Sequence, residues 1–229
     1  MQKSTQPLTK NQEAFIGFLL KSQALQFGSF VLKSGRHAAY FVNMGKFDSG
    51  SAISELGEYY AAHINEYIAP LPDLIFGPAY KGIPLAVTTA AALYQKFGKD
   101  IGYTFDRKEE KDHGDGGKLV GRKINSGDRV VIVEDVVTAG TTLRQVVPFL
   151  TETLRAKVVG VVVAVDRQEK GSGEKSAIKE AEDELGVKVF PIVQIRQIID
   201  YLSKSNPTGY VIPPQTLDEA QRYLETYGS

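Results

Sequence analysis

Residues 129–145 read RVVIVEDVVTAGTTLRQ, and this stretch decides the fold. It starts with an unbroken β-branched run at 130–133, which is typical of a strand buried on both faces of a parallel sheet. Glu134 and Asp135 follow where that strand should end. A turn of small and hydroxylated residues then leads into 143–150, which we expect to be helical. The stretch therefore predicts a strand, an acidic turn and a helix.

This strand-turn-helix unit predicts a phosphate site. A helix N-terminus offers unpaired backbone N–H groups and the positive end of the helix dipole. Gly140 permits close backbone approach, threonine hydroxyls add donors, and the acidic pair suits sugar hydroxyls or a hydrated Mg2+. A lone acidic pair is more often merely solvated, with Thr141 as an ordinary N-cap. The apolar run before the pair and the TAGTT turn after it favour the site.

Composition narrows the classes of protein. The 229 residues are 42% hydrophobic, which is enough for one α/β domain over 1–229 with a full core. The 27 basic and 27 acidic residues cancel, so net charge favours neither nucleic acid nor a membrane surface. The chain has no cysteine and hence no thiolate nucleophile, and its N-terminus is polar. We expect a cytoplasmic protein.

The rest of the chain alternates between strand and helix patterns. Capping boxes at Thr9/Gln12 and Thr216/Glu219 predict helices reaching about Gln26 and Tyr227. Hairpin arms at 29–32 and 40–42 complete a small hood over about residues 1–45. The remaining pattern predicts a mostly parallel central sheet flanked by helices. Its strands are expected at 74–76, 101–105, 130–133, 158–165 and 189–193, and its helices at 51–68, 83–97, 143–150 and 175–185.

Three further strand ends carry polar groups, and ligands bind at this edge of such sheets. Lys81 follows the first strand in a GPAYKG turn, where it is suited to a diphosphate; alone it would be an ordinary surface lysine. Residues 107–120 are charged and glycine-rich, which is typical of a mobile loop that is either merely solvated or able to close over a ligand. Arg167 is suited to a carboxylate, although a salt bridge to Asp166 explains it equally well.

These motifs resemble known families. Residues 129–145 are similar to the phosphoribosyl pyrophosphate (PRPP) signature of type I phosphoribosyltransferases. The ordered set FGSFVLKSGRHAAYF, IFGPAYKGIPL, FDRKEEKDHGDGGKLVG, VEDVVTAGTT and AVDRQE resembles the orotate phosphoribosyltransferase family over residues 27–169. The resemblance implies the type I phosphoribosyltransferase fold with its N-terminal hood. One departure is Glu134, where many members have Asp.

The resemblance also implies roles by position. Catalytic roles fall on Lys111, Lys81 and Asp135. Orotate would be held by Lys33, Phe41, Val42, Thr138 and Arg167. PRPP would be held by Lys33, Tyr80, Lys81, Arg107, Lys108, Lys111, His113, Glu134, Asp135, Val136, Val137, Thr138, Ala139, Gly140, Thr141 and Thr142.

The implied reaction joins N1 of orotate to the ribose of PRPP, a step in pyrimidine (UMP) biosynthesis. Mg2+ would bind mainly through PRPP and water, with no direct protein ligand. A homodimer is implied, with the loop 107–120 shared across the interface. Two alternatives stay open: a purine-type phosphoribosyltransferase, and a regulatory protein that binds PRPP without catalysis. The TAGTT turn permits both, whereas the KSGR hairpin and the charged loop favour orotate.

Overall fold

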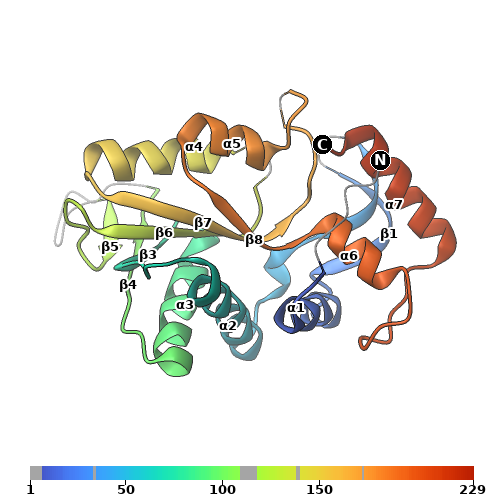
Figure 1. The fold of residues 1–229 in the computed structure, drawn as a ribbon, viewed down its shortest axis with the longest axis horizontal. Coiled ribbons are helices and arrows are strands. Elements are labelled where there is room, and N and C mark those ends of the chain that lie inside the picture. The colour runs from blue at the N-terminus through green and yellow to red at the C-terminus, as the bar shows by residue number, and fades with distance from the viewer. Residues whose placement is uncertain (1–6, 33–34, 109–117, 138–139, 172) are drawn as a thin grey trace.

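The computed structural model describes residues 7–32, 35–108, 118–137, 140–171 and 173–229 (Figure 1). The strands are β1 Leu25–Val31, β2 His37–Val42, β3 Leu74–Gly77, β4 Gly102–Asp106, β5 Leu119–Gly121, β6 Arg129–Glu134, β7 Lys157–Asp166 and β8 Val189–Gln194. The α-helices are α1 Lys10–Lys21, α2 Gly50–Tyr67, α3 Gly82–Phe97, α4 Thr141–Pro148, α5 Ala177–Leu185, α6 Ile195–Leu202 and α7 Pro214–Tyr227. A 3-10 turn at Met44–Lys46 and a π-helical turn at Phe149–Thr153 complete these elements.

The central sheet has six strands in the order β5-β4-β3-β6-β7-β8. Every neighbouring pair is parallel except β4 and β5, which are antiparallel. The predicted mostly parallel sheet is therefore confirmed. Strand β5 was not predicted, because it begins within the charged segment 107–120 and its three residues are too few to show an alternating pattern.

Alternate residues of the central strands enter two separate cores. Along β6, Val131 and Val133 pack into one core, whereas Val130 and Ile132 pack into the other. Helices α2 and α3 cover the first face of the sheet, and α4 and α5 cover the second (Figure 1). Because both faces are covered, each buried valine adds roughly 1.5–3 kcal/mol, and the strand needs apolar residues throughout.

The N-terminal hairpin forms a separate two-stranded sheet. Strands β1 and β2 pair antiparallel, with an irregularity between Phe27 and Phe30. The hairpin and α1 lie beside α6 and α7, at the end of the molecule away from β5 (Figure 1). Helix α7 contacts both hairpin strands. The N-terminal hairpin and the C-terminal helix therefore pack together, next to the carboxyl end of β7.

Helix α1 ends earlier than predicted. The Thr9/Gln12 capping box is present, so its start is confirmed. The helix stops at Lys21 rather than about Gln26, since Gln23 has a φ of 58° and Leu25 already begins β1. Gln23 has the left-handed conformation that commonly follows a helix end, but glutamine is not the residue that usually signals it.

Two features of the C-terminal region differ from prediction. The capping box at Thr216 and Glu219 is wrong, because α7 begins at Pro214 and Thr216 lies inside it. Proline suits the first helical position, where its ring presets φ and no N–H is needed. Helix α6 was not predicted. It follows β8 directly, without a connecting loop to separate the two patterns.

None of the helices in the described ranges is long and apolar enough to cross a membrane. A cytoplasmic location stays a prediction. The extent of the domain, the limit of the hood and the mobility of the loop also stay predictions.

Close packing of α2 on α3 depends on Gly57. A Cβ at this position would lie 2.7 Å from the Thr88 carbonyl carbon. We expect Gly57→Ala to lower the free energy of unfolding by about 1–3 kcal/mol, because overpacking outweighs the gain of about 1 kcal/mol in helix propensity. Urea unfolding measures this change. Gly50→Ala at the start of the same helix is the matched control, with nothing within 4 Å of its new Cβ. Equal stabilities of the two variants would contradict the close approach.

Candidate active site

A cleft opens where the winding of the sheet reverses. Strands β3 and β6 are neighbours in the sheet. From β3 the chain continues to β4 on one side of this pair, and from β6 it continues to β7 on the other side. The loops leaving β3 and β6 therefore diverge, and parallel sheets bind ligands at such points. The cleft has a volume of about 410 Å3. It is lined by Pro78, Ala79, Tyr80, Lys81, Glu134, Asp135, Val136, Val137, Gly140, Thr141, Thr142 and Leu143.

The acidic pair forms one wall of this cleft, and both side chains are largely buried. The Asp135 N–H donates to Glu134 Oε1 at 3.1 Å, and Lys81 Nζ reaches Asp135 Oδ2 at 2.5 Å from the loop opposite. From α2, the buried Tyr60 hydroxyl donates to the Glu134 carbonyl oxygen at 2.7 Å. The carboxylates are thus oriented by hydrogen bonds and are not freely solvated.

Glu134 has a perturbed protonation equilibrium. Burial is the largest cause and raises its pKa from 4.5 to about 7. The Asp135 N–H opposes this rise, whereas the negative charge of the Asp135 side chain adds to it. A carboxyl group with this pKa changes charge near neutral pH, and such shifts are common at functional sites.

The N-terminus of α4 forms a second wall. Gly140 is its N-cap with a φ of 70°, a conformation that favours glycine. Thr141 is the first helical residue, so the alternative that Thr141 is an ordinary N-cap is wrong. Backbone N–H groups in the first turn of a helix have no acceptor within the helix, and here that turn lines the cleft. This wall suits an anion.

The loop after β3 is fixed from the neighbouring strand. Asp106 at the end of β4 accepts a hydrogen bond from the Ala79 N–H at 2.6 Å. The loop presents Tyr80 with 70% of its surface exposed, beside Lys81. Glycine is required at Gly77, since a Cβ there would lie 2.0 Å from the Gly82 carbonyl oxygen.

Only some of the residues predicted to contact PRPP from the loop after β4 lie among the described residues. The Arg107 N–H donates to the Lys118 carbonyl at 2.7 Å. Arg107 Nη1 is buried and has no hydrogen-bond partner among the described residues. Lys108 is exposed. Lys33, Lys111, His113, Thr138 and Ala139 lie outside the described residues, so their roles stay predictions.

Arg167 lies at the end of β7, as predicted, but its partner differs from the predicted alternative. Its Nη2 donates to Glu169 Oε1 at 2.5 Å. Asp166 instead accepts a hydrogen bond from the Gln168 N–H at 2.8 Å, so the alternative salt bridge to Asp166 is wrong. On β2, Phe41 and Val42 are half-buried, and the Phe41 ring stacks on Phe30 at 5.6 Å.

Four residues that orient these groups were not assigned a role from sequence. Asp106 and Glu169 stand within the FDRKE and AVDRQE motifs, whose charged residues are a signal that they interact. Tyr60 and Tyr223 lie on helices, where their spacing predicts only burial. Their hydroxyl contacts depend on residues 74 and 54 positions away in the chain, for which the sequence carries no local signal.

Comparison with known proteins identifies the family. Residues 45–193 match the model of the phosphoribosyl transferase domain. Orotate phosphoribosyltransferase of Bifidobacterium adolescentis is 48% identical over 224 residues, which cover 94% of this chain and 96% of the relative. The chain belongs to the orotate phosphoribosyltransferase family. The family predicted from the ordered motifs is confirmed.

Other orotate phosphoribosyltransferases extend this result. That of Clostridium beijerinckii is 44% identical over 219 residues, covering 95% of this chain and 98% of the relative. The crystal structure of the Francisella tularensis orotate phosphoribosyltransferase has a TM-score of 0.82 at 35% identity, and covers 94% of this chain and 100% of that one. The predicted type I phosphoribosyltransferase fold is confirmed with it.

The raised pKa of Glu134 makes stability depend on pH. The folded carboxyl titrates near 7 and the reference value is 4.5, so folding favours the protonated form. The ligand-free protein should therefore lose stability as the pH rises through this interval, by at most about 3 kcal/mol. Glu134→Gln should remove that loss, as measured by thermal unfolding between these pH values.

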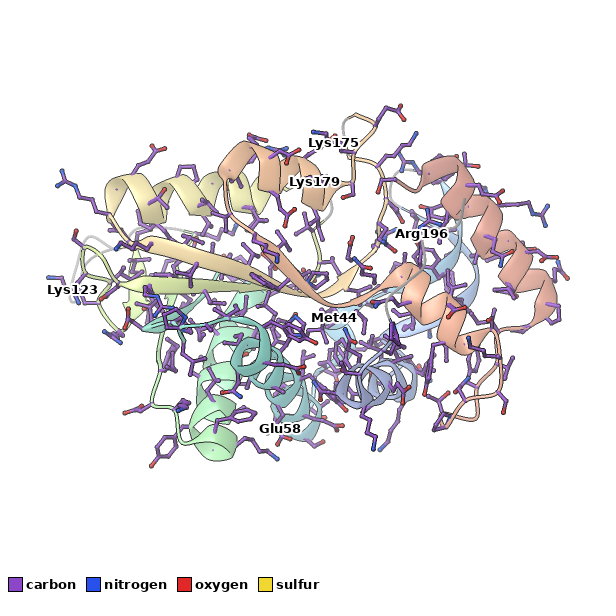
Figure 2. All side chains as sticks on the ribbon, in the orientation of Figure 1. Met44, Glu58, Lys123, Lys175, Lys179 and Arg196 are labelled. Carbon is purple, nitrogen blue, oxygen red and sulfur yellow. The ribbon has the colours of Figure 1, made fainter. Side chains whose placement is uncertain are left out.

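Glu58→Gln is the control, because Glu58 lies on the outer side of α2 and pairs with Lys96 at 2.9 Å (Figure 2). It should keep the wild-type pH profile. If the stability of Glu134→Gln and that of wild type vary with pH in the same way, Glu134 is not the group whose raised pKa causes the loss.

Proposed function

We propose that this protein transfers the 5-phosphoribosyl group of PRPP to N1 of orotate, releasing pyrophosphate and forming orotidine 5′-monophosphate for pyrimidine synthesis. The observation that carries the proposal is the cleft between β3 and β6. There a buried acidic pair, a lysine and a helix N-terminus face one space. These groups match the parts of PRPP: hydroxyls, diphosphate and 5′-phosphate.

PRPP would bind in the cleft in a single orientation. The 5′-phosphate accepts hydrogen bonds from the first turn of α4 and from the hydroxyls of Thr141 and Thr142. The ribose hydroxyls donate to Glu134 and Asp135, which are oriented but retain free lone pairs. The diphosphate lies towards Lys81. Tyr80, Arg107, Lys108, Lys111 and His113 complete its proposed contacts, while Lys33 and residues 136–140 complete those of the donor as a whole.

The residues at the cleft fit a Mg2+ ion carried by the substrate. Glu134 and Asp135 supply hard carboxylate oxygens, which suit Mg2+ through bound water. Within the described ranges, no three His, Asp or Glu side chains gather as a metal cluster. When bound, Mg2+ supplies positive charge that stabilises the diphosphate as a leaving group.

Orotate would be held between β2 and the end of β7. Arg167 recognises its carboxylate, for which the planar guanidinium is well matched. Phe41 and Val42 contact the pyrimidine, with Lys33 and Thr138 as further proposed contacts. The base would then approach C1′ of the ribose from the side opposite the diphosphate.

In the proposed reaction the bond from C1′ to the diphosphate oxygen breaks as the bond from orotate N1 to C1′ forms. Positive charge develops on the ribose and negative charge on the diphosphate. No protein nucleophile is required, so the protein contributes positioning and electrostatic stabilisation. Lys81 and Asp135 form an ion pair at 2.5 Å, which the diphosphate would replace in part by its own contact with Lys81. Lys111 is the proposed acid to a pyrophosphate oxygen.

The homodimer stays a proposal, and an exposed stripe on α3 supports it. Pro84, Val87, Ala91 and Tyr94 recur at helical spacing, and all four are exposed. Tyr94 has 62% of its surface exposed, which is unusual for an aromatic residue aligned with other apolar side chains. The stripe begins three residues after Lys81. A second copy seated on it would therefore lie beside the cleft.

Mixing two inactive variants tests this shared arrangement. Lys111→Ala damages the loop and Arg167→Ala damages the body of the site. If the loop acts in the partner's site, mixed dimers contain one intact site, and random mixing should restore about a quarter of wild-type activity. Activity after co-refolding is the measurement.

Adding Val87→Glu to both variants is the control, because a charge on the stripe should block association and recovery. A mixture without Val87→Glu that stays inactive, although light scattering shows dimers, would contradict loop donation. A fully active wild-type monomer would contradict the shared site.

An ultraviolet assay tests the reaction itself. We expect loss of orotate absorbance with PRPP and Mg2+, release of one pyrophosphate per orotate, and negligible conversion without Mg2+. Uracil is the matched control acceptor, since it lacks only the carboxylate and should react at least about a hundredfold less efficiently. PRPP binding without orotate conversion would contradict the proposal. Purine bases in the same assay would then separate a purine-type enzyme from a regulatory protein.

A further inference from the structure

Glu169 is the centre of a partly buried polar cluster outside the cleft. Its Oε1 accepts three hydrogen bonds: from Arg167 Nη2 at 2.5 Å, from the Tyr40 hydroxyl at 3.0 Å and from the Tyr223 hydroxyl at 3.1 Å. These donors come from the end of β7, from β2 and from α7. One carboxylate oxygen thus joins the hairpin, the central sheet and the C-terminal helix.

The backbone around Glu169 is held in place by the end of the chain. Glu169 and Gly228 form an antiparallel bridge, and the Lys170 N–H donates to the Tyr227 carbonyl at 2.8 Å. Arg196 on α6 joins the same two segments (Figure 2). Its N–H donates to Gln168 Oε1 at 3.2 Å, and its guanidinium donates to the Leu224 carbonyl at 3.4 Å. The position of Glu169 is therefore determined by several contacts.

The hydroxyls of Tyr40 and Tyr223 are suited to donate hydrogen bonds to Glu169 over the whole physiological pH range. Their rings meet edge to face at 5.6 Å, and Arg167 Cζ lies 5.9 Å from the centre of the Tyr40 ring. Burial, followed by the charge of Glu169, raises the pKa of Tyr223 to about 12 and that of Tyr40 well above its usual value. Both hydroxyls stay protonated at neutral pH, so each donates to Glu169.

This arrangement restrains Arg167 and keeps it charged. Although burial lowers the pKa of Arg167, the charge of Glu169 raises it above its usual value. Glu169 accepts from Nη2 of the guanidinium, and the tyrosine hydroxyls keep its Oε1 in position. An incoming carboxylate would have to break three hydrogen bonds to displace Glu169. Binding at the rest of the guanidinium is therefore favoured.

We infer that Glu169, held by Tyr40 and Tyr223, is a positioning residue that presets Arg167 for the carboxylate of the pyrimidine acceptor. The inference rests on the proposed function, in which Arg167 binds orotate. It gives α7 a part in recognition of the acceptor: Tyr223 acts through Glu169 and Arg167 without touching the substrate.

Steady-state kinetics of the full-length enzyme test this role. We expect Glu169→Gln to raise KM for orotate about tenfold and Tyr223→Phe to raise it about threefold, because the guanidinium loses a charged or a supporting contact. KM for PRPP should stay within about twofold of wild type in both. Tyr227→Phe is the matched control: it removes a hydroxyl one turn further along α7, outside the cluster, and keeps the ring that lies 4.7 Å from Arg36 Cζ.

Arg167→Ala distinguishes failure of the proposed function from failure of the inference about Glu169. If wild type does not convert orotate, the proposed function fails. If wild type is active and Arg167→Ala does not convert orotate, the function stands and the other variants decide the inference. An unchanged or lower orotate KM in Glu169→Gln and Tyr223→Phe would overturn it, as would an equal rise in KM for both substrates. If Glu169→Gln does not fold, Tyr223→Phe decides alone, because it keeps the aromatic ring.

Discussion

Burial of β6 on both faces is the constraint on which the site depends. Its side chains alternate between two cores, and sliding β6 by one residue would exchange every contact with α2 and α3 for one with α4 and α5. The register is therefore set by many apolar contacts. Glu134 and Asp135 lie where the apolar strand ends, so the core of the protein determines the position of its carboxylates. The same packing places the N-terminus of α4 beside them.

The polar groups at this edge are arranged at a cost in stability. Glu134 is buried and its pKa is raised, and Lys81 is held across an open cleft by a single carboxylate. Such groups are unfavourable in a protein that only has to fold. The surrounding sheet compensates for them, since both its faces are covered. Local frustration of this kind is expected where a charged ligand later supplies the missing partners.

Much of this fold could be predicted from sequence because its signals are local. The β-branched run of β6 and the Thr9/Gln12 capping box each act within one element. Gly98 ends α3 in the same local way, as a C-cap in the left-handed conformation. The elements that were predicted wrongly or missed lack such a local signal. The left-handed Gln23 ends α1 without a glycine, Pro214 displaces a plausible capping box, and α6 follows β8 without a break.

The residues of the candidate site differ in the same way between those with local sequence signals and those whose contacts are long-range. The acidic pair and the α4 turn are contiguous in sequence and line one cleft. By contrast, the environment of Arg167 depends on tertiary structure. Its sequence neighbour Asp166 is the obvious partner, yet alternate side chains point to opposite faces at a strand end, and the arginine pairs with Glu169. No local pattern shows that Tyr40 and Tyr223 will donate to that same glutamate.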